Sequence, residues 1–420
     1  MDFISAVEHL AGRVGLEVPR EQQSAEASQQ QQQRKSIYEV LEQTCSFFKL
    51  QLKEHADRDQ AVNYLKNRGL SGEIARDYGL GFAPPGWDNL LAHIGKTNHE
   101  RQLLIDSGMV IDKPDEKKTY DRFRERIMFP IRDLRGRVIA FGGRIIGDGK
   151  PKYLNSPETP VFHKSRELYG LYEARRLNKK LEQLLVVEGY MDVVALAQHG
   201  IHFAVATLGT ATTSEHLERL FRMVSRVVFC FDGDSAGRNA AWKALQIALP
   251  HLRDGRSARF LFVPDGEDPD SLVRAEGKEK FMGRIETAQQ LSEFFFDKLK
   301  LEVEMDSLDG KAALSQLAMP MINKVPKGVF RELMVGELSS ITNLTSERLW
   351  SLSAAETPNP EPASSPTAST SHRVPDPEFD GYADIDPGEL PEDDEYQGYI
   401  DLPTASLPLS RLAEKALEIA

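Results

Sequence analysis

Three acidic residues follow short apolar runs in the middle of the chain. Glu188 comes directly after LLVV, and Asp232 and Asp234 come after VVFCF. The carboxyl ends of parallel strands meet at one edge of a sheet, so we expect these carboxylates to lie together although 44 residues separate Glu188 from Asp232. Such carboxylates repel one another unless a cation lies between them, and an all-oxygen ligand set suits Mg²⁺ or Mn²⁺. The pattern predicts a divalent-cation site of the kind that serves phosphoryl transfer.

A second pair of acids, Asp268 and Asp270, follows another apolar run at 258–263 and extends the predicted metal site. Glu188 would act either as a metal ligand or as a general base, and residue type does not separate these roles. Asp192, four residues later, would support the site from the same helix face, although a solvated helix residue is an equal interpretation. Any one of these acids also fits a helix N-cap. Their recurrence on successive strands favours the metal site.

A basic segment lies just upstream, since residues 117–180 contain 17 Lys and Arg against 7 Asp and Glu. Such groups hold triphosphates or a nucleic-acid backbone, whereas many charge runs are only solvated faces. The neighbouring aromatic residues and the predicted metal site favour contact with nucleotides or nucleic acid. The candidates are Arg122, Arg124, Arg126, Arg132, Arg144, Lys152, Asn155, Lys164 and Arg166.

The elements that must position these residues predict an α/β fold with a parallel sheet flanked by helices. Three runs rich in apolar residues are each followed by a helical pattern, which is typical of βαβ units: LLVV at 184–187, FAVATL before the turn at 209–210, and VVFCF at 227–231. The run ARFLFV at 258–263 predicts a fourth strand. Two further strand-like runs, at 127–131 and 138–141, precede them. We therefore expect a catalytic subdomain at 181–277, with an amino-proximal basic α+β subdomain at 1–180 and a carboxyl-proximal helical bundle at 278–350.

Low-complexity stretches predict the connections. Residues 22–35, rich in Gln and Ser, are expected to be a flexible connector. Residues 351–420 contain ten of the 23 prolines and carry a net charge of −12, which equals that of the whole chain. They predict a disordered acidic and Pro-rich linker at 351–405, followed by the start of a truncated helical domain at 406–420.

Composition and motif checks exclude several classes of protein. Two isolated cysteines make neither a disulfide framework nor a zinc ribbon, so we expect no zinc. No apolar run reaches about 18 residues and no signal peptide is recognisable, so we expect a cytoplasmic chain without a membrane partner. Gly149-Lys150 is followed by Pro151, and Arg144 stands where a Walker A motif requires its first glycine, which excludes a motor ATPase.

Eight stretches resemble the bacterial DnaG-type primase family. VVEGYMDVVAL, ATLGTATT, FCFDGDSAGRNAAWKAL and GEDPDSLVR resemble its toprim module, and DRFRERIMFPI, FGGR, PKYLNSPETPVFHK and YLKNRGLSGEIA resemble the amino-proximal half of its polymerase region. The resemblance covers about residues 1–350. It implies a nucleotidyltransferase of the primosome, a DNA-directed RNA polymerase that makes primers for DNA replication from ribonucleoside triphosphates on a single-stranded DNA template.

The family's site residues carry over onto matching positions of this chain. Its metal carboxylates fall on Glu188, Asp232, Asp234, Asp268 and Asp270, and its nucleotide- and template-binding residues on Arg144, Lys152, Lys164 and Arg68. The family also has a zinc-binding domain and a domain that docks on the replicative helicase. We expect both to be missing here, which leaves a central fragment, monomeric and associated with the nucleoid.

Two other functions remain open. A topoisomerase or nuclease of the toprim class would share the carboxylates, but a topoisomerase also needs a tyrosine nucleophile, which no feature marks among the 11 tyrosines. A non-enzymatic DNA-binding scaffold would use the carboxylates only structurally. Charge-neutral substitutions at Asp232 and Asp234 separate a scaffold from an enzyme.

Overall fold

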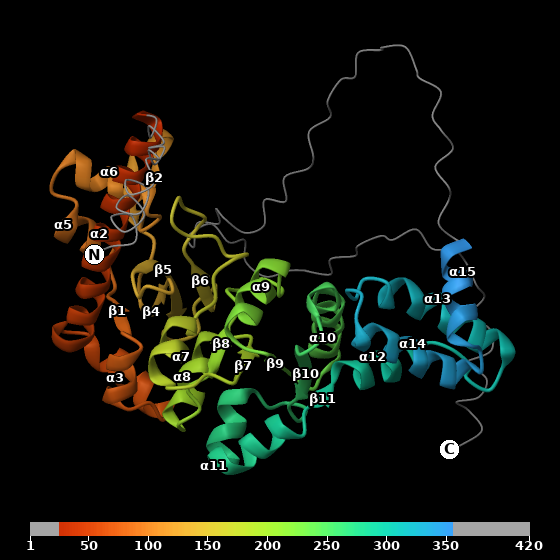
Figure 1. Ribbon diagram of the computed structural model, residues 1–420. Helices are drawn as coiled ribbons and strands as arrows, with labels where there is room; N and C mark the ends of the chain where they lie inside the picture. The colour runs from red at the N-terminus through yellow and green to blue at the C-terminus, as the bar shows by residue number, and fades with distance from the viewer. Residues whose placement is uncertain (1–24, 356–420) are drawn as a thin grey trace, which may run out of the picture. The chain divides into compact units, whose positions relative to one another are not determined.

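The structure, a computed structural model, describes residues 25–355, and the side chains of residues 30–353 (Figure 1). The linker predicted at 351–405 lies outside the described residues except for its first five, which end the last helix, and the helix predicted at 406–420 lies wholly outside them. No helix among the described residues is both long and apolar enough to cross a membrane.

The amino-proximal subdomain is built on a four-stranded antiparallel sheet with the order β1-β4-β5-β6. The strands predicted at 127–131 and 138–141 are confirmed as the central pair. The strands of the sheet are β1 (Gly81–Ala83), β4 (Arg126–Arg132), β5 (Val138–Ile145) and β6 (Tyr153–Asn155). A separate hairpin pairs β2 (Val110–Lys113) with β3 (Lys118–Asp121), and the short helix η1 (Pro114–Glu116) joins them.

Five helices accompany this sheet, and α2 packs against β1 and β5. They are α2 (Ala25–Glu54), α3 (Arg58–Asn67), α4 (Gly72–Asp77), α5 (Asn89–Ile94) and α6 (Asn98–Asp106). Residues 25–35, which we expected within a flexible connector, instead form the first turns of α2. Gln and Ala are good helix formers, and this stretch continues directly into the part of α2 that buries Ile37 and Leu41.

The predicted α/β unit is confirmed as a five-stranded sheet with the order β11-β10-β9-β7-β8. Four of its strands, β10, β9, β7 and β8, run parallel to one another. The fifth strand, β11, pairs antiparallel with β10 at the edge of the sheet, and the sequence did not predict it. The strands are β7 (Gln183–Val187), β8 (Ala204–Ala206), β9 (Arg226–Phe231), β10 (Ser257–Phe262) and β11 (Gln289–Gln290). The helix α7 (Leu171–Leu177) precedes β7, and the helices between the strands are α8 (Tyr190–Gln198), α9 (Ser214–Met223), α10 (Ser235–Ala248), η2 (Leu249–His251) and α11 (Pro269–Glu286).

The strand order creates a switch point between β7 and β9. From β7 the chain passes through α8 to β8 on one side, and then crosses through α9 to β9 on the other side. In open α/β sheets, ligands bind outside the carboxyl ends of the strands at such a point. The topology therefore predicts a ligand site at the residues that follow β7 and β9.

The carboxyl-proximal helical bundle is also confirmed. It consists of α12 (Leu291–Lys300), α13 (Leu308–Ile322), α14 (Val329–Thr342) and α15 (Ser346–Ala355). Phe294 of α12 packs against Phe260 of β10, with ring centroids 4.9 Å apart. Asp254, in the loop before β10, accepts hydrogen bonds at 2.9 Å from the backbone nitrogens of Val329 and Phe330 and so caps α14. These contacts join the bundle to the edge of the parallel sheet.

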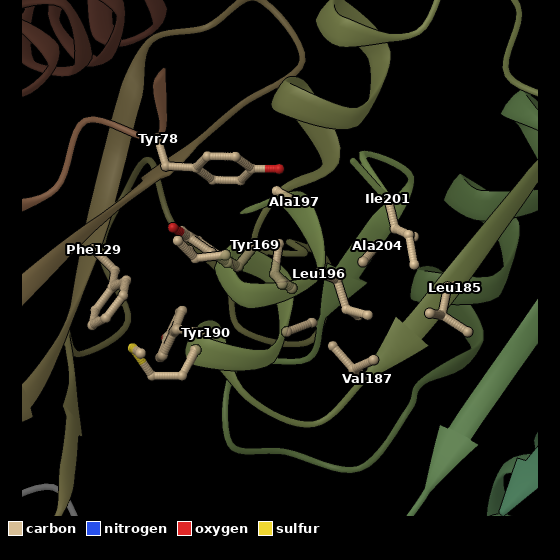
Figure 2. Packing of buried hydrophobic residues seen from close by; sticks show 14 of the residues in the cluster. Tyr78, Phe129, Tyr169, Leu185, Val187, Tyr190, Leu196, Ala197, Ile201 and Ala204 are labelled. Carbon is tan, nitrogen blue, oxygen red and sulfur yellow. The ribbon is translucent and has the colours of Figure 1, made fainter. Parts of the chain in front are cut away.

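An aromatic cluster joins the antiparallel sheet to the parallel one (Figure 2). Phe129 of β4 stacks on Tyr190 of α8 with centroids 5.3 Å apart, and Tyr169 meets both rings edge to face. A Cβ atom on Gly142 of β5 would lie only 2.4 Å from the Tyr190 ring. Glycine at this position is therefore what admits the tyrosine and lets the two subdomains pack closely.

Candidate active site

Glu188 and Asp232 follow neighbouring strands at the switch point. Glu188 comes directly after β7 and Asp232 directly after β9, and the two strands pair in parallel with Leu185 opposite Val228. Burial raises the pKa of Glu188, and the negative charges of Asp232 and Asp234 raise it further. Burial also raises the pKa of Asp232, followed by the effect of Asp234. The structure thus brings together the acids that the sequence placed 44 residues apart.

A cavity of about 370 Å³ lies at this edge of the sheet and has an acidic and a basic wall. Backbone and apolar atoms from the turns after β7 and β9 complete the lining, including Gly189 and Cys230. The acidic wall consists of Glu188, Asp192, Asp232, Asp268 and Asp270, and the basic and polar wall consists of Arg68, Arg144, Lys152, Tyr153 and Asn155. Nine of the predicted site residues therefore share one cavity.

Asp192 is a buried residue of this wall, which contradicts its interpretation as a solvated helix residue. Only 9% of it is exposed, and its Oδ2 accepts a hydrogen bond from the backbone nitrogen of Gly189 at 3.0 Å. Burial raises its pKa to about 8, with Asp268 as the next contributor. The carboxyl group holds the turn after β7, and with this pKa it is mostly protonated at neutral pH.

Asp234 and Asp268 are helix caps as well as members of the acidic group. Asp234 accepts from the Gly237 nitrogen at 2.7 Å at the start of α10, and Asp268 accepts from the Ser271 nitrogen at 2.6 Å at the start of α11. Asp268 lines the cavity, whereas Asp234 does not, although its charge raises the pKa of Glu188. The N-cap interpretation therefore holds for both acids, and each cap uses only one carboxylate oxygen, which leaves the second oxygen for another partner.

Asp270 has cationic partners of its own. Its side chain is 1% exposed, with Oδ2 3.0 Å from Nη1 of Arg68 and Oδ1 2.9 Å from Nε of Arg274. The Arg274 contact is an ion pair without hydrogen-bond geometry, since Oδ1 has no hydrogen-bond partner. Asp270 was expected to bind metal, but the structure engages it with two guanidinium groups.

The acidic wall has the chemistry of a divalent-cation site, although it is not a preformed one. The donors are carboxylate oxygens, which suit Mg²⁺ or Mn²⁺. Burial and then neighbouring negative charge raise the pKa values of Glu188 and Asp232, and a cation would offset that charge. Within residues 30–353, no three acidic, His or Cys side chains converge as a ready ligand set. The residues best placed to hold a cation are Glu188 and Asp232, with Asp268 beside them.

The basic wall is organised around Arg144 of β5. This residue is 9% exposed, and its Nη1 donates to the hydroxyl of Tyr153 at 2.6 Å. Asn155 donates to the carbonyl oxygen of Leu208 at 2.8 Å and accepts from the Tyr190 hydroxyl at 2.6 Å. Lys152 reaches the cavity from an exposed position. Two fixed polar groups and one exposed cation thus face the carboxylates.

Two of the predicted basic residues serve inside the fold and do not line the cavity. Arg126 is 4% exposed and donates to the carbonyl oxygen of Pro151 at 2.9 Å, and burial lowers its pKa to about 10. Arg132 lies 3.4 Å from the buried Glu173 and donates to the carbonyl oxygen of Gly136. We therefore correct the expectation that they face a ligand, because both are engaged by internal partners.

The remaining basic candidates lie outside the cavity lining: Arg122, Arg124, Lys164 and Arg166. Arg124 stacks over the ring of Trp87 at 3.9 Å, and Trp87 is 55% exposed. Sequence reasoning missed this tryptophan, and it also missed Tyr64, Tyr153 and Arg274. For Tyr64 and Arg274 the sequence contained a signal. Tyr64 lies four residues before Arg68, and Arg274 lies four residues after Asp270, so each shares a helix face with a predicted site residue.

Three family models match consecutive parts of the chain. The DNA primase catalytic core, N-terminal domain, matches residues 47–175, and the Toprim-like model matches residues 185–273. The DnaB-helicase binding domain of primase matches residues 292–347. The matched ranges follow the antiparallel sheet, the parallel sheet and the helical bundle in turn.

The third match corrects our expectation that the helicase-docking domain is missing. Residues 292–347 cover most of α12, α13 and α14, which we had interpreted only as a helical bundle. Amphipathic helices with an ordinary apolar face contain no short motif that marks a partner. A helicase-binding region therefore could not be distinguished from a structural bundle by its pattern.

Relatives match over most of this chain. It is 58% identical over 354 residues to a DNA primase of Pseudomonas aeruginosa, which is 84% of this chain and 53% of the relative. It is 52% identical over 340 residues to the DNA primase of Escherichia coli K12, which is 81% of this chain and 58% of the relative. The chain therefore spans about half the length of the curated relatives it matches.

Two solved structures match the fold. A crystal structure of a DNA primase domain from Pseudomonas aeruginosa has a TM-score of 0.74 and 60% identity, covering 76% of this chain and 99% of that one. A DnaG primase catalytic domain bound to ssDNA has a TM-score of 0.73 and 52% identity, with the same coverage. With identities this high over almost the whole of those domains, the chain belongs to the family of DnaG-type bacterial DNA primases.

Proposed function

We propose that this chain synthesises RNA primers on single-stranded DNA by metal-dependent nucleotidyl transfer. The observation that carries the proposal is the single cavity in which carboxylates face Arg68, Arg144 and Lys152. Nucleotidyl transfer needs both walls, since cations hold the triphosphate and carboxylates hold the metal that activates the reacting oxygens. The relatives named DNA primase support this function.

The residues take the following roles in this proposal. Glu188 and Asp232 hold Mg²⁺ or Mn²⁺, supported by Asp268 and Asp234, and the Toprim-like match supports a divalent cation. The cation supplies charge stabilisation for the transferred phosphoryl group. Arg144, fixed by Tyr153, and the exposed Lys152 bind the phosphates of the incoming ribonucleotide. Asp192 holds the turn that carries Glu188.

The template would cross the surface around Trp87. Its ring is 55% exposed, lies under the guanidinium of Arg124 and meets Tyr120 edge to face at 5.4 Å. An exposed ring held by a cation is a platform for stacking bases of single strands. Trp87→Ala should weaken binding of an oligothymidine strand about 5- to 100-fold, with little change in thermal stability. Unchanged affinity of the variant for the strand would show that Trp87 does not contact the template.

We further propose that the helical bundle binds the replicative helicase, as the description of its family model suggests. Of the eight large apolar side chains exposed in the described residues, five lie within residues 292–347. Val329 and Leu333 lie one turn apart on α14 and are each 65% exposed. Leu333→Ser should weaken co-purification with the helicase while leaving primer synthesis unchanged. If the variant still binds the helicase, the helicase contact lies elsewhere on the bundle.

The decisive experiment is template-dependent incorporation of ribonucleotides, with and without Mg²⁺. Asp232→Asn should lower incorporation by at least about 100-fold while circular dichroism and thermal unfolding show an intact fold. If full incorporation survives this change, the metal assignment is wrong. Relaxation of supercoiled DNA with a covalent tyrosine adduct would instead favour a topoisomerase.

A further inference from the structure

Tyr64 of α3 lies between two arginines that line the cavity. Its ring centroid is 5.9 Å from Cζ of Arg68 and 5.4 Å from Cζ of Arg144. Arg68 is the C-cap residue of the same helix, whereas Arg144 belongs to β5. One aromatic ring therefore connects the end of a helix with a strand of the antiparallel sheet, at the cationic side of the cavity.

Each arginine has an anchor of its own, and Tyr64 is the anchor that they share. Arg68 donates to Asp270 at 3.0 Å, and Arg144 donates to the hydroxyl of Tyr153 at 2.6 Å. Two guanidinium groups at one site repel each other, and the face of an aromatic ring attracts both of them and offers a plane on which they stack. The shared ring therefore holds the two cations near each other.

The hydroxyl of Tyr64 takes no part in this arrangement. It is buried and has no hydrogen-bond partner, and the same is true of Nε of Arg144. A buried hydroxyl without a partner costs stability, so the useful part of this side chain is its ring. Phenylalanine should therefore replace it, and an aliphatic residue should not.

We infer that Tyr64 is a positioning residue, whose ring fixes Arg68 and Arg144 so that both guanidinium groups meet the triphosphate of the incoming nucleotide. The inference rests on the proposed primase function, but the two ring contacts that carry it involve no residue of the acidic wall. Tyr64 is not a lining residue of the cavity and acts only through the two arginines.

The test compares Tyr64→Phe with Tyr64→Leu in the full chain. Tyr64→Leu should raise the KM for ribonucleoside triphosphates about 3- to 30-fold, and weaken inhibition by tripolyphosphate to the same extent, with a smaller change in kcat. Tyr64→Phe should leave both values within about 2-fold of the unaltered chain. Tyr38→Leu is a matched control, because Tyr38 stacks with Arg137 at 3.8 Å in a pair away from the cavity; it should leave KM unchanged.

Three outcomes would overturn the inference: an unchanged KM in Tyr64→Leu, a loss in Tyr64→Phe equal to that in Tyr64→Leu, or the same rise of KM in Tyr38→Leu. If Tyr64→Leu does not fold, Tyr64→Met, whose unbranched side chain is longer and more adaptable but has no ring, takes its place. Calorimetric binding of tripolyphosphate in EDTA needs no turnover. It therefore tests the inference even if the unaltered chain makes no primers, a result that would refute the proposed function alone.

Discussion

Arg68 and Asp270 form an ion pair across 202 residues of sequence, with Nη1 and Oδ2 3.0 Å apart. Arg274 lies against the other carboxylate oxygen, and the Asp270 side chain is 1% exposed. One buried carboxylate thereby joins the end of α3 to the first turn of α11. Both residues line the cavity, so the pair links the amino-proximal subdomain to the parallel-sheet subdomain at the site.

Asp270→Asn should lower the free energy of unfolding of the metal-free protein by about 1–3 kcal/mol, because two arginines lose their shared anion. The side chains of Arg68 and Arg274 are 30% and 37% exposed, so hydration limits the loss. Urea unfolding in EDTA measures it, with the exposed Glu279→Gln on the same helix as the control. Unchanged stability in EDTA, together with lost stabilisation by Mg²⁺, would make Asp270 a metal ligand instead.

Glu188→Gln should stabilise the metal-free protein while abolishing primer synthesis. Burial and the charges of Asp232 and Asp234 raise the pKa of Glu188, so its ionised form is disfavoured in the fold. Removing that charge should add about 0.5–2 kcal/mol, as is common where active sites trade stability for function. Thermal unfolding in EDTA checks this, and a lower melting temperature of the variant would show that Glu188 has an internal partner.

Gly142→Ala should destabilise the protein by about 1–3 kcal/mol, because the added methyl group overlaps the Tyr190 ring. The same displacement moves the Tyr190 hydroxyl away from Asn155, so primer synthesis should fall as well. Gly283→Ala in α11 is the matched control, since nothing lies within 4 Å of its added Cβ. The control should gain up to about 1 kcal/mol in chemical unfolding. Equal stability of the two variants would show that α8 can shift to accommodate the added methyl group without a loss of stability.

Deprotonation of Asp121 should lower the free energy of unfolding as the pH rises. Its carboxylate accepts from the backbone nitrogens of Leu90 and Leu91 at 2.7 and 3.0 Å, and burial raises its pKa from 3.8 to about 6. A group that binds its proton more tightly in the folded state stabilises the fold below pH 4, and this contribution is lost as the pH passes 6.

The variant Asp121→Asn removes this titration. Between pH 4 and pH 7, the free energy of unfolding of the variant should therefore rise relative to that of the unaltered chain by about 2 kcal/mol. Urea unfolding at several pH values measures the difference between the two proteins. A difference that stays constant with pH would mean that the two backbone amides hold the pKa at its ordinary value.

The sequence predicted where Glu188 and Asp232 lie because the relevant signals are local. Apolar runs at 184–187 and 227–231 specify strands, and the rules that govern parallel sheets bring the ends of such strands to one edge. The same reasoning located the strands of the antiparallel sheet. It failed at residues 25–35, where the helix propensity of Gln and Ala outweighed the low complexity of the stretch.

What only the tertiary structure decided is which charged group meets which partner. Arg126, Arg132 and Arg144 come from one basic segment, yet the first two bind internal carbonyl or carboxylate groups and only Arg144 reaches the cavity. Strand formation depends on neighbours in the chain, whereas ion pairing depends on contacts such as that of Arg68 with Asp270. The sequence by itself therefore determined the sheet and its acidic edge, and folding over long range selected the cations that face it.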